Sequence, residues 1–318
     1  MTTSLVAVEP DVEGRLALDR PMELRATLGH LLRGAGDPTM RLAANAVARA
    51  ATMPAGPAVV EIRVDEAAVR FAAWGPGAVE AAEAVPALLG LDDDAAGFEP
   101  ARHPVVARLA RVHRGLRIGR TGAVFEALLP AILEQRITGT EAYRGYRRLV
   151  RAHGAPGPGP SGLWIPPTAA TIAGLPSWTF PALGIEPRRG ALLRRVAREA
   201  GRLEALAGAA RRPGGGGAGA AELAASLRRF AGIGPWTAAE VTLRALGDPD
   251  AVSTGDAHLP HIVAWALAGE PRATDERMLE LLAPWSGHRA RVIRLLEVSG
   301  LGPPRFGPRV APRDIRRL

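Results

Sequence analysis

The sequence predicts a mainly α-helical protein with an N-terminal α+β domain. Runs rich in β-branched residues occur only in the first hundred positions. From about Pro104 onward, apolar residues recur at three- and four-residue spacing, as at Val124, Leu128 and Ile132, which is typical of helices with one buried face. The chain is 47% apolar and 23% charged, values typical of a globular protein. We therefore predict an N-terminal α+β domain over residues 1–103 and a helical region over residues 104–318.

In the N-terminal domain, Val59–Val64 and Ala68–Ala72 are predicted strands, joined by a turn at Asp65 and Glu66. Three segments are predicted helices, the last interrupted by Pro86: 24–32, 39–51 and 79–89.

Apolar spacing and turn residues predict the helices of the second region: 124–133, 141–150, 168–173, 188–207, 221–231, 237–246, 256–268, 276–282 and 289–299. Residues 154–162 are a Pro/Gly linker. Residues 213–219 contain five glycines and are expected to form a surface loop. A phosphate-binding loop is disfavoured there because no predicted strand precedes it.

Composition excludes several kinds of chemistry. The chain has no cysteine, which rules out disulfides, thiolate zinc sites, thiol nucleophiles and cysteine-ligated iron–sulfur clusters. No apolar run approaches the roughly 18 residues of a membrane span. The N-terminus lacks the basic-then-apolar pattern of a secretion signal, so we expect a cytoplasmic protein without membrane contact.

All 40 basic residues are arginine, and the net charge is +8. Without lysine, no side-chain amine is available to form a Schiff base. Residues 289–318 carry eight arginines against Glu297 and Asp314. Such a basic segment is typical of a surface that contacts a polyanion, although a solvated tail has the same composition.

The sharpest local feature is a turn between two predicted helices at Gly232, Ile233, Gly234 and Pro235. Glycines permit positive φ angles and leave backbone N–H groups uncovered, and together with the start of the next helix these groups can hold a phosphate. Ile233 is expected to plug the space between the helices. Taken alone, the turn is better interpreted as an ordinary helical hairpin with a glycine cap.

Asp256 follows Gly255 at a predicted helix start, eighteen residues after Ala238. An acidic residue at that position is also an ordinary helix cap, and in isolation the cap is the better interpretation.

Together these features resemble the helix-hairpin-helix DNA glycosylase superfamily, and most closely its alkyladenine glycosylase II (AlkA-type) branch. The resemblance rests on segments that occur in the family's order along most of the chain: Leu18–Pro21, Leu28–Leu32, Phe125–Thr138, Leu183–Arg189, Gly232–Ala238 and Gly255–Asp256. It implies an enzyme that flips a damaged base out of double-stranded DNA and hydrolyses its N-glycosidic bond. Asp256 matches the family's catalytic carboxylate.

Bifunctional relatives carry a lysine two residues after the second hairpin glycine, where this chain has Trp236. The resemblance therefore implies a monofunctional glycosylase that leaves an abasic site without cutting the strand. No catalytic cofactor and no metal ligand are implied, although related hairpins often hold a structural monovalent cation. We expect a monomer.

The family's alkylation branch lines its base pocket with aromatic residues, and Trp236 and Phe125 match such positions. Three others carry polar residues: Glu240, Arg294 and His30. Glu240 and Arg294 are expected to pair with each other, to hydrogen-bond a base edge, or to face solvent. An alkylated purine of the 3-methyladenine type is the expected substrate. The alternatives are another lesion read by a more polar pocket, or a catalytically weak lesion-binding protein.

By the same resemblance, DNA contacts are expected from the N–H groups of Gly232 and Gly234 and from Ile233, Thr237 and Gln135. Arg136 occupies the position from which the family fills the gap left by the flipped base; a solvent-facing arginine is the alternative.

Overall fold

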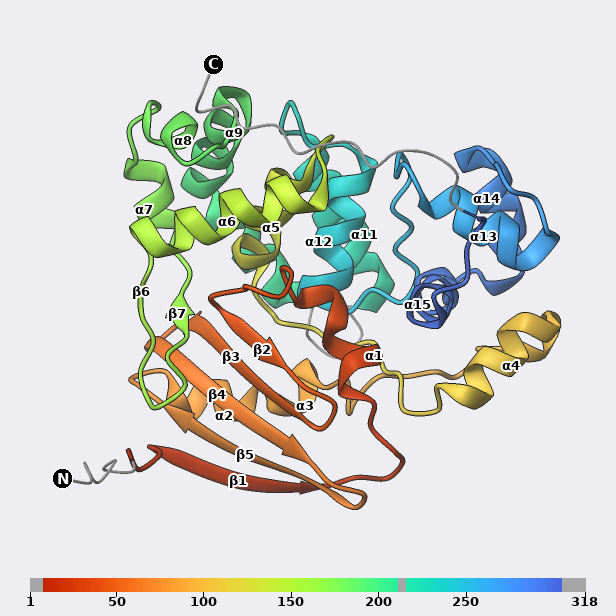
Figure 1. The fold of residues 1–318 in the computed structure, drawn as a ribbon, viewed down its shortest axis with the longest axis horizontal. Helices are drawn as coiled ribbons and strands as arrows, with labels where there is room; N and C mark the ends of the chain where they lie inside the picture. The colour runs from red at the N-terminus through yellow and green to blue at the C-terminus, as the bar shows by residue number, and fades with distance from the viewer. Residues whose placement is uncertain (1–7, 211–215, 305–318) are drawn as a thin grey trace.

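The computed structural model describes residues 8–210 and 216–304. Figure 1 shows an antiparallel sheet at one end of the molecule and a helical body beside it. The sheet has five strands in the order β1-β5-β4-β3-β2. Their bounds are β1 Val12–Ala17, β2 Met40–Leu42, β3 Ala46–Met53, β4 Gly56–Val64 and β5 Ala68–Trp74. The predicted fold class, mainly helical with an N-terminal α+β part, is confirmed.

The two predicted strands are β4 and β5, and the predicted turn between them is confirmed. Asp65 Oδ1 accepts hydrogen bonds from the backbone N–H groups of Ala67 and Ala68, which closes the turn. The helix predicted over residues 39–51 is wrong, because that segment forms β2 and β3. In β3, Val47 is 3% exposed and pairs with Ile62 of β4. Pairing with a buried strand outweighs the helical preference of this alanine-rich segment.

Short helices connect and cover the sheet. The segment predicted as a helix over 24–32 forms α1 (Leu24–Leu28) and a 3₁₀ turn, η1 (Gly29–Leu31). The segment 79–89 forms α2 (Ala78–Glu83) and α3 (Val85–Leu88), and Pro86 lies in the first turn of α3, where its missing N–H costs nothing. Helix α2 packs against β4 and β5.

The helical body begins with α4 (Pro104–Val112) and is interrupted by two short paired strands, β6 (Ala155–Pro156) and β7 (Trp164–Ile165). Its other helices are α5 Val124–Glu134, α6 Gly139–His153, α7 Ala169–Gly174, α8 Thr179–Ala182, α9 Pro187–Arg198, α10 Ala200–Ala210, α11 Gly216–Arg228, α12 Pro235–Leu246, α13 Leu259–Ala268, α14 Asp275–Leu282 and α15 Arg289–Ser299.

Two helix predictions need correction. The single helix predicted over 188–207 is divided into α9 and α10 at Glu199. The glycine-rich segment 213–219 was predicted to be a loop, but Gly216–Gly219 form the first turn of α11; residues 211–215 lie outside the described residues. The basic segment also lies partly outside them, from residue 305 onward.

Helix α5 is the centre of the largest hydrophobic core. Its residues Leu128, Leu129 and Ile132 are at most 2% exposed and pack with side chains of α6, α9, α11 and α12. A second core lies under the sheet, and a third joins α4, α13, α14 and α15 to Ala26 of α1.

The predicted boundary between residues 103 and 104 stays a prediction. Within the described parts of the chain, no helix is long and apolar enough to cross a membrane.

Candidate active site

The predicted hairpin is the turn between α11 and α12, near the middle of Figure 1. Gly232 has φ +102°, a conformation that favours glycine, and an added Cβ there would lie 3.1 Å from Leu192. Gly232 is exposed, whereas Ile233 is 5% exposed and belongs to the main core. Ile233 therefore packs between the helices as predicted, and it does not offer its side chain to DNA.

The side chains of Gln135 and Thr237 hydrogen-bond to each other and are not free to contact DNA. The Gln135 side-chain amide, just after α5, donates to the Gly232 carbonyl and to the Thr237 hydroxyl, both at 2.9 Å. Thr237 is 2% exposed. The expectation that the Thr237 side chain contacts DNA is therefore corrected: with Gln135, it ties the hairpin to the end of α5.

Two arginines that sequence reasoning missed complete this attachment. Arg189 of α9 is 4% exposed, and its Nε donates to the Gln135 carbonyl at 3.1 Å. Arg195, two turns further along α9, donates to the Ala231 carbonyl at 2.6 Å. The hairpin and the end of α5 are thus both fastened to one helix, α9, which fixes the surface around the hairpin.

Arg136 lies in this fixed surface and is exposed. Its φ is +52°, and it is the sole non-glycine residue with a positive φ in the described chain. Such a conformation costs roughly 1–3 kcal/mol in a residue with a Cβ and is maintained here by the fastened Gln135 next to it. Strain of this kind is common at functional positions, which favours the predicted role over an ordinary surface arginine.

We expect Arg136→Gly to raise the free energy of unfolding by about 1 kcal/mol, because glycine adopts this φ without strain. Arg136→Ala is the matched control, since it removes the same side chain and retains the strained Cβ. Chemical denaturation measures both. Equal stabilities of the two variants would contradict the strain interpretation.

Asp256 lies in the loop between α12 and α13, and its two carboxylate oxygens have separate tasks. Oδ1 accepts from the backbone N–H groups of His258 and Leu259, at 2.7 and 2.9 Å, at the start of α13. Oδ2 accepts from the indole Nε1 of Trp236 at 2.9 Å. The helix predicted from residue 256 therefore begins at Leu259 with His258 as its N-cap, and Asp256 lies just before it, where one oxygen accepts from N–H groups at the helix start and the other faces the first turn of α12.

Glu240 and Arg244 follow Trp236 at successive turns of α12, so the three residues share one face of the helix. Glu240 and Arg244 form an ion pair with side chains 15% and 9% exposed, and Ser253 donates to Glu240 at 2.5 Å. Burial raises the pKa of Glu240, but Arg244 and the Ser253 hydroxyl outweigh it, and the pKa lies below its ordinary value of 4.5. Glu240 is therefore a buried carboxylate anion.

Arg294 and Glu240 neither pair with each other nor face solvent, which corrects two of the three alternatives. Arg294 of α15 is 7% exposed; it forms an ion pair with Glu297 at 2.5 Å and donates to the Ala26 carbonyl at 3.1 Å. It thus joins α15 to α1, close to His30.

His30 lies where the N-terminal part meets α12 and α15. Its carbonyl accepts from Arg33 Nη1 at 2.9 Å and from Arg244 Nε at 3.3 Å. Both ring nitrogens are buried without a hydrogen bond of good geometry, and the backbone of Thr27 is close enough to oppose the fall in the pKa of the ring. Burial, followed by the guanidiniums of Arg294, Arg244 and Arg33, holds the pKa of His30 well below 6.5, so the ring is neutral.

The low pKa of His30 makes stability depend on pH. The unfolded chain binds a proton as pH falls through about 6.5, whereas the folded chain does not, so stability falls as pH drops below that value. We expect His30→Phe to flatten the decline between pH values of about 7 and about 5, by up to about 1.4 kcal/mol per pH unit. Denaturant titrations at both pH values measure the slope. Parallel slopes in wild type and variant would contradict the assignment.

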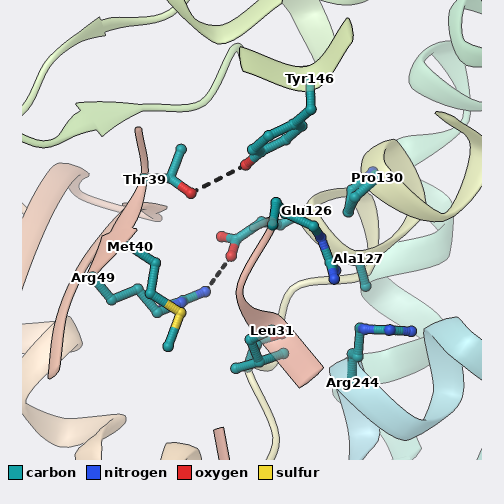
Figure 2. A pocket seen from close by; sticks show the side chains of 11 residues that line it. Leu31, Thr39, Met40, Arg49, Glu126, Ala127, Pro130, Tyr146 and Arg244 are labelled. Atoms are coloured by element: carbon teal, nitrogen blue, oxygen red, sulfur yellow. Dashed lines mark hydrogen bonds and ion pairs between the residues drawn. The ribbon is translucent and has the colours of Figure 1, made fainter. Parts of the chain in front are cut away.

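Two cavities lie away from Asp256 and have neither it nor Trp236 in their walls. The smaller, of about 30 Å³, has room for a water molecule. Figure 2 shows it between the sheet and α5, with the Arg49–Glu126 ion pair and the Tyr146–Thr39 hydrogen bond on one side and Arg244 on the other. It is a polar gap in the contact between the two parts of the chain.

The larger cavity, of about 300 Å³, is mostly apolar, and Phe125 lines it with Leu129 and Ala169. Phe125 lies at the start of α5, ten residues before Gln135, a separation of roughly 15 Å along a helix. The expectation that Phe125 belongs to the base pocket is therefore corrected.

Within the described residues, no group of three or more His, Asp or Glu side chains has the arrangement of a metal site.

Most of the backbone is similar to solved DNA glycosylase structures. The 3-methyladenine DNA-glycosylase from Archaeoglobus fulgidus superposes with a TM-score of 0.74 and 20% identity, over 90% of this chain and 98% of that one. The 8-oxoguanine glycosylase/lyase from Clostridium acetobutylicum gives 0.67 and 15%, over 91% and 99%. The 3-methyladenine DNA glycosylase Mag1 from Schizosaccharomyces pombe, in complex with abasic DNA, gives 0.50 and 20%, over 64% and 94%.

This chain therefore has the helix-hairpin-helix DNA glycosylase fold. No family model matches the sequence. No curated protein sequence matches it either. The likeness thus lies in the backbone, and activity has to be inferred from the chain's own residues.

Proposed function

We propose that this protein is a monofunctional DNA glycosylase of base excision repair, with Asp256 as its catalytic carboxylate. One observation carries the proposal: Asp256 is held against Trp236, one turn after the exposed hairpin, on a helix whose start is fixed to α5 and α9. A carboxylate and a half-buried aromatic ring are thus placed together beside a turn suited to a DNA phosphate.

The reaction needs little from the protein besides charge and position. Water forms a bond to the sugar C1′ and gives up a proton to the carboxylate or to solvent, the N-glycosidic bond breaks, and its electron pair leaves with the base. The sugar becomes positively charged in the transition state, and a nearby carboxylate stabilises it or orients the water. The Asp256 oxygens are fixed by N–H donors, which keep the carboxylate in place without neutralising it.

DNA is expected to bind over the hairpin through the N–H groups of Gly232 and Gly234. Arg136 is the residue we assign to the space left by the flipped base; guanidinium groups stack on bases and also contact phosphates. If so, Arg136→Gly and Arg136→Ala both lose base release, although only the first gains stability.

The absence of lysine makes a sharp prediction about strand cleavage. Position 236, where bifunctional relatives have lysine, is tryptophan, and no lysine occurs elsewhere. We expect purified protein to generate abasic sites that break only after alkali treatment, and borohydride to trap no covalent protein–DNA adduct. The terminal amine is the one remaining primary amine, so the control is protein with that amine blocked. An adduct that survives blocking would contradict the proposal.

The resemblance to the alkylation branch favours an alkylated purine of the 3-methyladenine type, and Trp236 supports it as a ring on which a cationic base can stack. The buried charges of Glu240, Arg244 and Arg294 favour a second candidate, a lesion read by hydrogen bonds.

Free-base detection with duplexes carrying methylated, deaminated and oxidised purines tests the activity and separates the two substrate candidates. Salt-sensitive DNA binding without release of any base would point instead to a lesion-binding protein.

A further inference from the structure

The larger cavity, of about 300 Å³, is a second concave site, away from the proposed catalytic carboxylate. Its walls come from five segments: β3, the start of α5, α6, the residues that lead from β7 into α7, and the start of α10. Asp256 and Trp236 are not among the described residues that line it. The cavity therefore lies at the joint between the sheet and the helical body.

The cavity has an apolar floor and an exposed rim. The floor consists of buried apolar residues: Phe125, Leu129, Pro166, Pro167 and Ala200. At the rim, Thr52, Thr168 and Gly201 are exposed, so the space is open to solvent from that side. Protein interiors rarely leave voids larger than a water molecule, because unfilled apolar volume forfeits packing contacts. An open apolar space of this size is typical of a ligand site.

The two charged side chains in the described wall are already engaged. Glu126 of α5 forms an ion pair with Arg49 of β3. Glu204 accepts from the backbone N–H groups of Val124 and Phe125, at 3.1 and 2.9 Å. A cation would therefore have to compete with existing partners, and an anion would be repelled by both carboxylates. Because an ion would lose its water without compensation, the wall favours an uncharged ligand.

Size and lining narrow the ligand further. An apolar cavity of about 150 Å³ already binds benzene, so about 300 Å³ has room for about two fused rings. The Phe125 ring in the wall gives another ring a surface to pack on.

We propose that this cavity binds a small uncharged aromatic molecule of about two fused rings, and that the ligand strengthens the joint between the sheet and the helical body. Two contacts that cross the joint lie in its wall: the Glu126–Arg49 ion pair and the hydrogen bond at 3.2 Å between the Tyr146 and Thr39 hydroxyls. A ligand seated beside Glu126 and Tyr146 packs on both parts of the chain at once. It therefore binds the native fold and not the unfolded chain.

The test titrates the full chain with three compounds that share one ring system: uncharged indole, anionic indole-3-acetate and cationic tryptamine. Calorimetry is expected to show one saturable site for indole and at least roughly 10-fold weaker binding of both charged compounds. Excess indole is expected to raise the Tm by roughly 2–4 °C. Absence of saturable indole binding, or tighter binding of either charged compound, would overturn the proposal. DNA is not needed, so the result does not depend on the proposed glycosylase function.

Gly201→Trp tests whether the bound indole occupies this cavity. A Cβ added at Gly201 meets no atom within 4 Å, so α10 accepts a side chain there, and a large ring at the rim fills the cavity. Gly201→Ala is the matched control, because it makes the same backbone change and leaves the space open. Indole affinity is expected to fall at least roughly 10-fold in the first variant and to stay at the wild-type value in the second.

Thermal unfolding checks that both variants fold. If Gly201→Trp does not fold, Ala169→Leu fills the same cavity from the start of α7 and takes its place. Equal indole affinity in wild type and a folded filling variant would overturn the proposal, because the indole would then bind elsewhere.

Discussion

Asp256→Asn is expected to lower base release by roughly 10²- to 10⁴-fold while DNA binding is retained. Asparagine is nearly isosteric, and its amide oxygen still accepts from the N–H groups of His258 and Leu259, so α13 keeps its cap. What is lost is the negative charge beside Trp236 and the acceptor for its indole N–H, because an amide NH2 can only donate. Single-turnover release of the free base, with a separate binding titration, measures the two effects.

Asp275→Asn is the matched control for this variant. Asp275 lies in α14 and accepts from the Gly255 N–H at 2.8 Å, so it is another acid on the same loop. Its amide counterpart retains that hydrogen bond, and we expect near wild-type release. If both variants lost release equally, the effect would belong to loop structure or overall charge, and the role of Asp256 would be refuted.

Glu240→Ala is expected to lower the free energy of unfolding by about 3–5 kcal/mol, because Arg244 would remain buried without its carboxylate partner. Glu99→Ala is the comparison, since Glu99 pairs with Arg102 at the surface, with side chains 61% and 46% exposed. That exposed pair is worth at most about 1 kcal/mol. Denaturant unfolding gives both values.

A double variant tests whether desolvated charge is the cause. Replacing both Glu240 and Arg244 by methionine removes the two charges together and should recover most of the lost stability, because apolar residues of similar volume often replace a buried pair without cost. No recovery would show that the loss comes from the contacts to Ser253 and to the His30 carbonyl.

The hairpin, its glycines and Asp256 were predictable because their signals are local. Gly-Ile-Gly-Pro carries its own turn chemistry, and an acid after Gly255 at a helix start is visible within a few residues. The helical body was predictable for the same reason, because the apolar residues of a helix recur at three- and four-residue spacing. For Gln135 and Thr237, the sequence predicted correctly that both lie beside the hairpin. Only the fold shows that their side chains hydrogen-bond to each other.

The cluster around His30 was predicted only in part: the resemblance placed His30, Glu240 and Arg294 together, but Arg33, Glu134 and Arg244 were missed, because the members come from distant parts of the chain. Arg33, Glu134, Arg244 and Arg294 meet His30 only after the N-terminal part has docked on α12 and α15. Each residue alone resembles a surface charge. The strands at residues 40–53 were missed for a related reason: short alanine-rich segments favour helix, and the partner that makes them strands is elsewhere.

The attachment of α12 at both ends also has a mechanical consequence. A twelve-residue helix is a stiff rod about 18 Å long. Its first turn is fixed to the surface around the hairpin, and its last part holds the backbone at His30. A tilt of the rod would therefore displace η1 as well, because its last part is bonded to the His30 carbonyl. The hairpin and the N-terminal part are thus linked through one stiff helix, so a shift at either end of α12 is expected at the other.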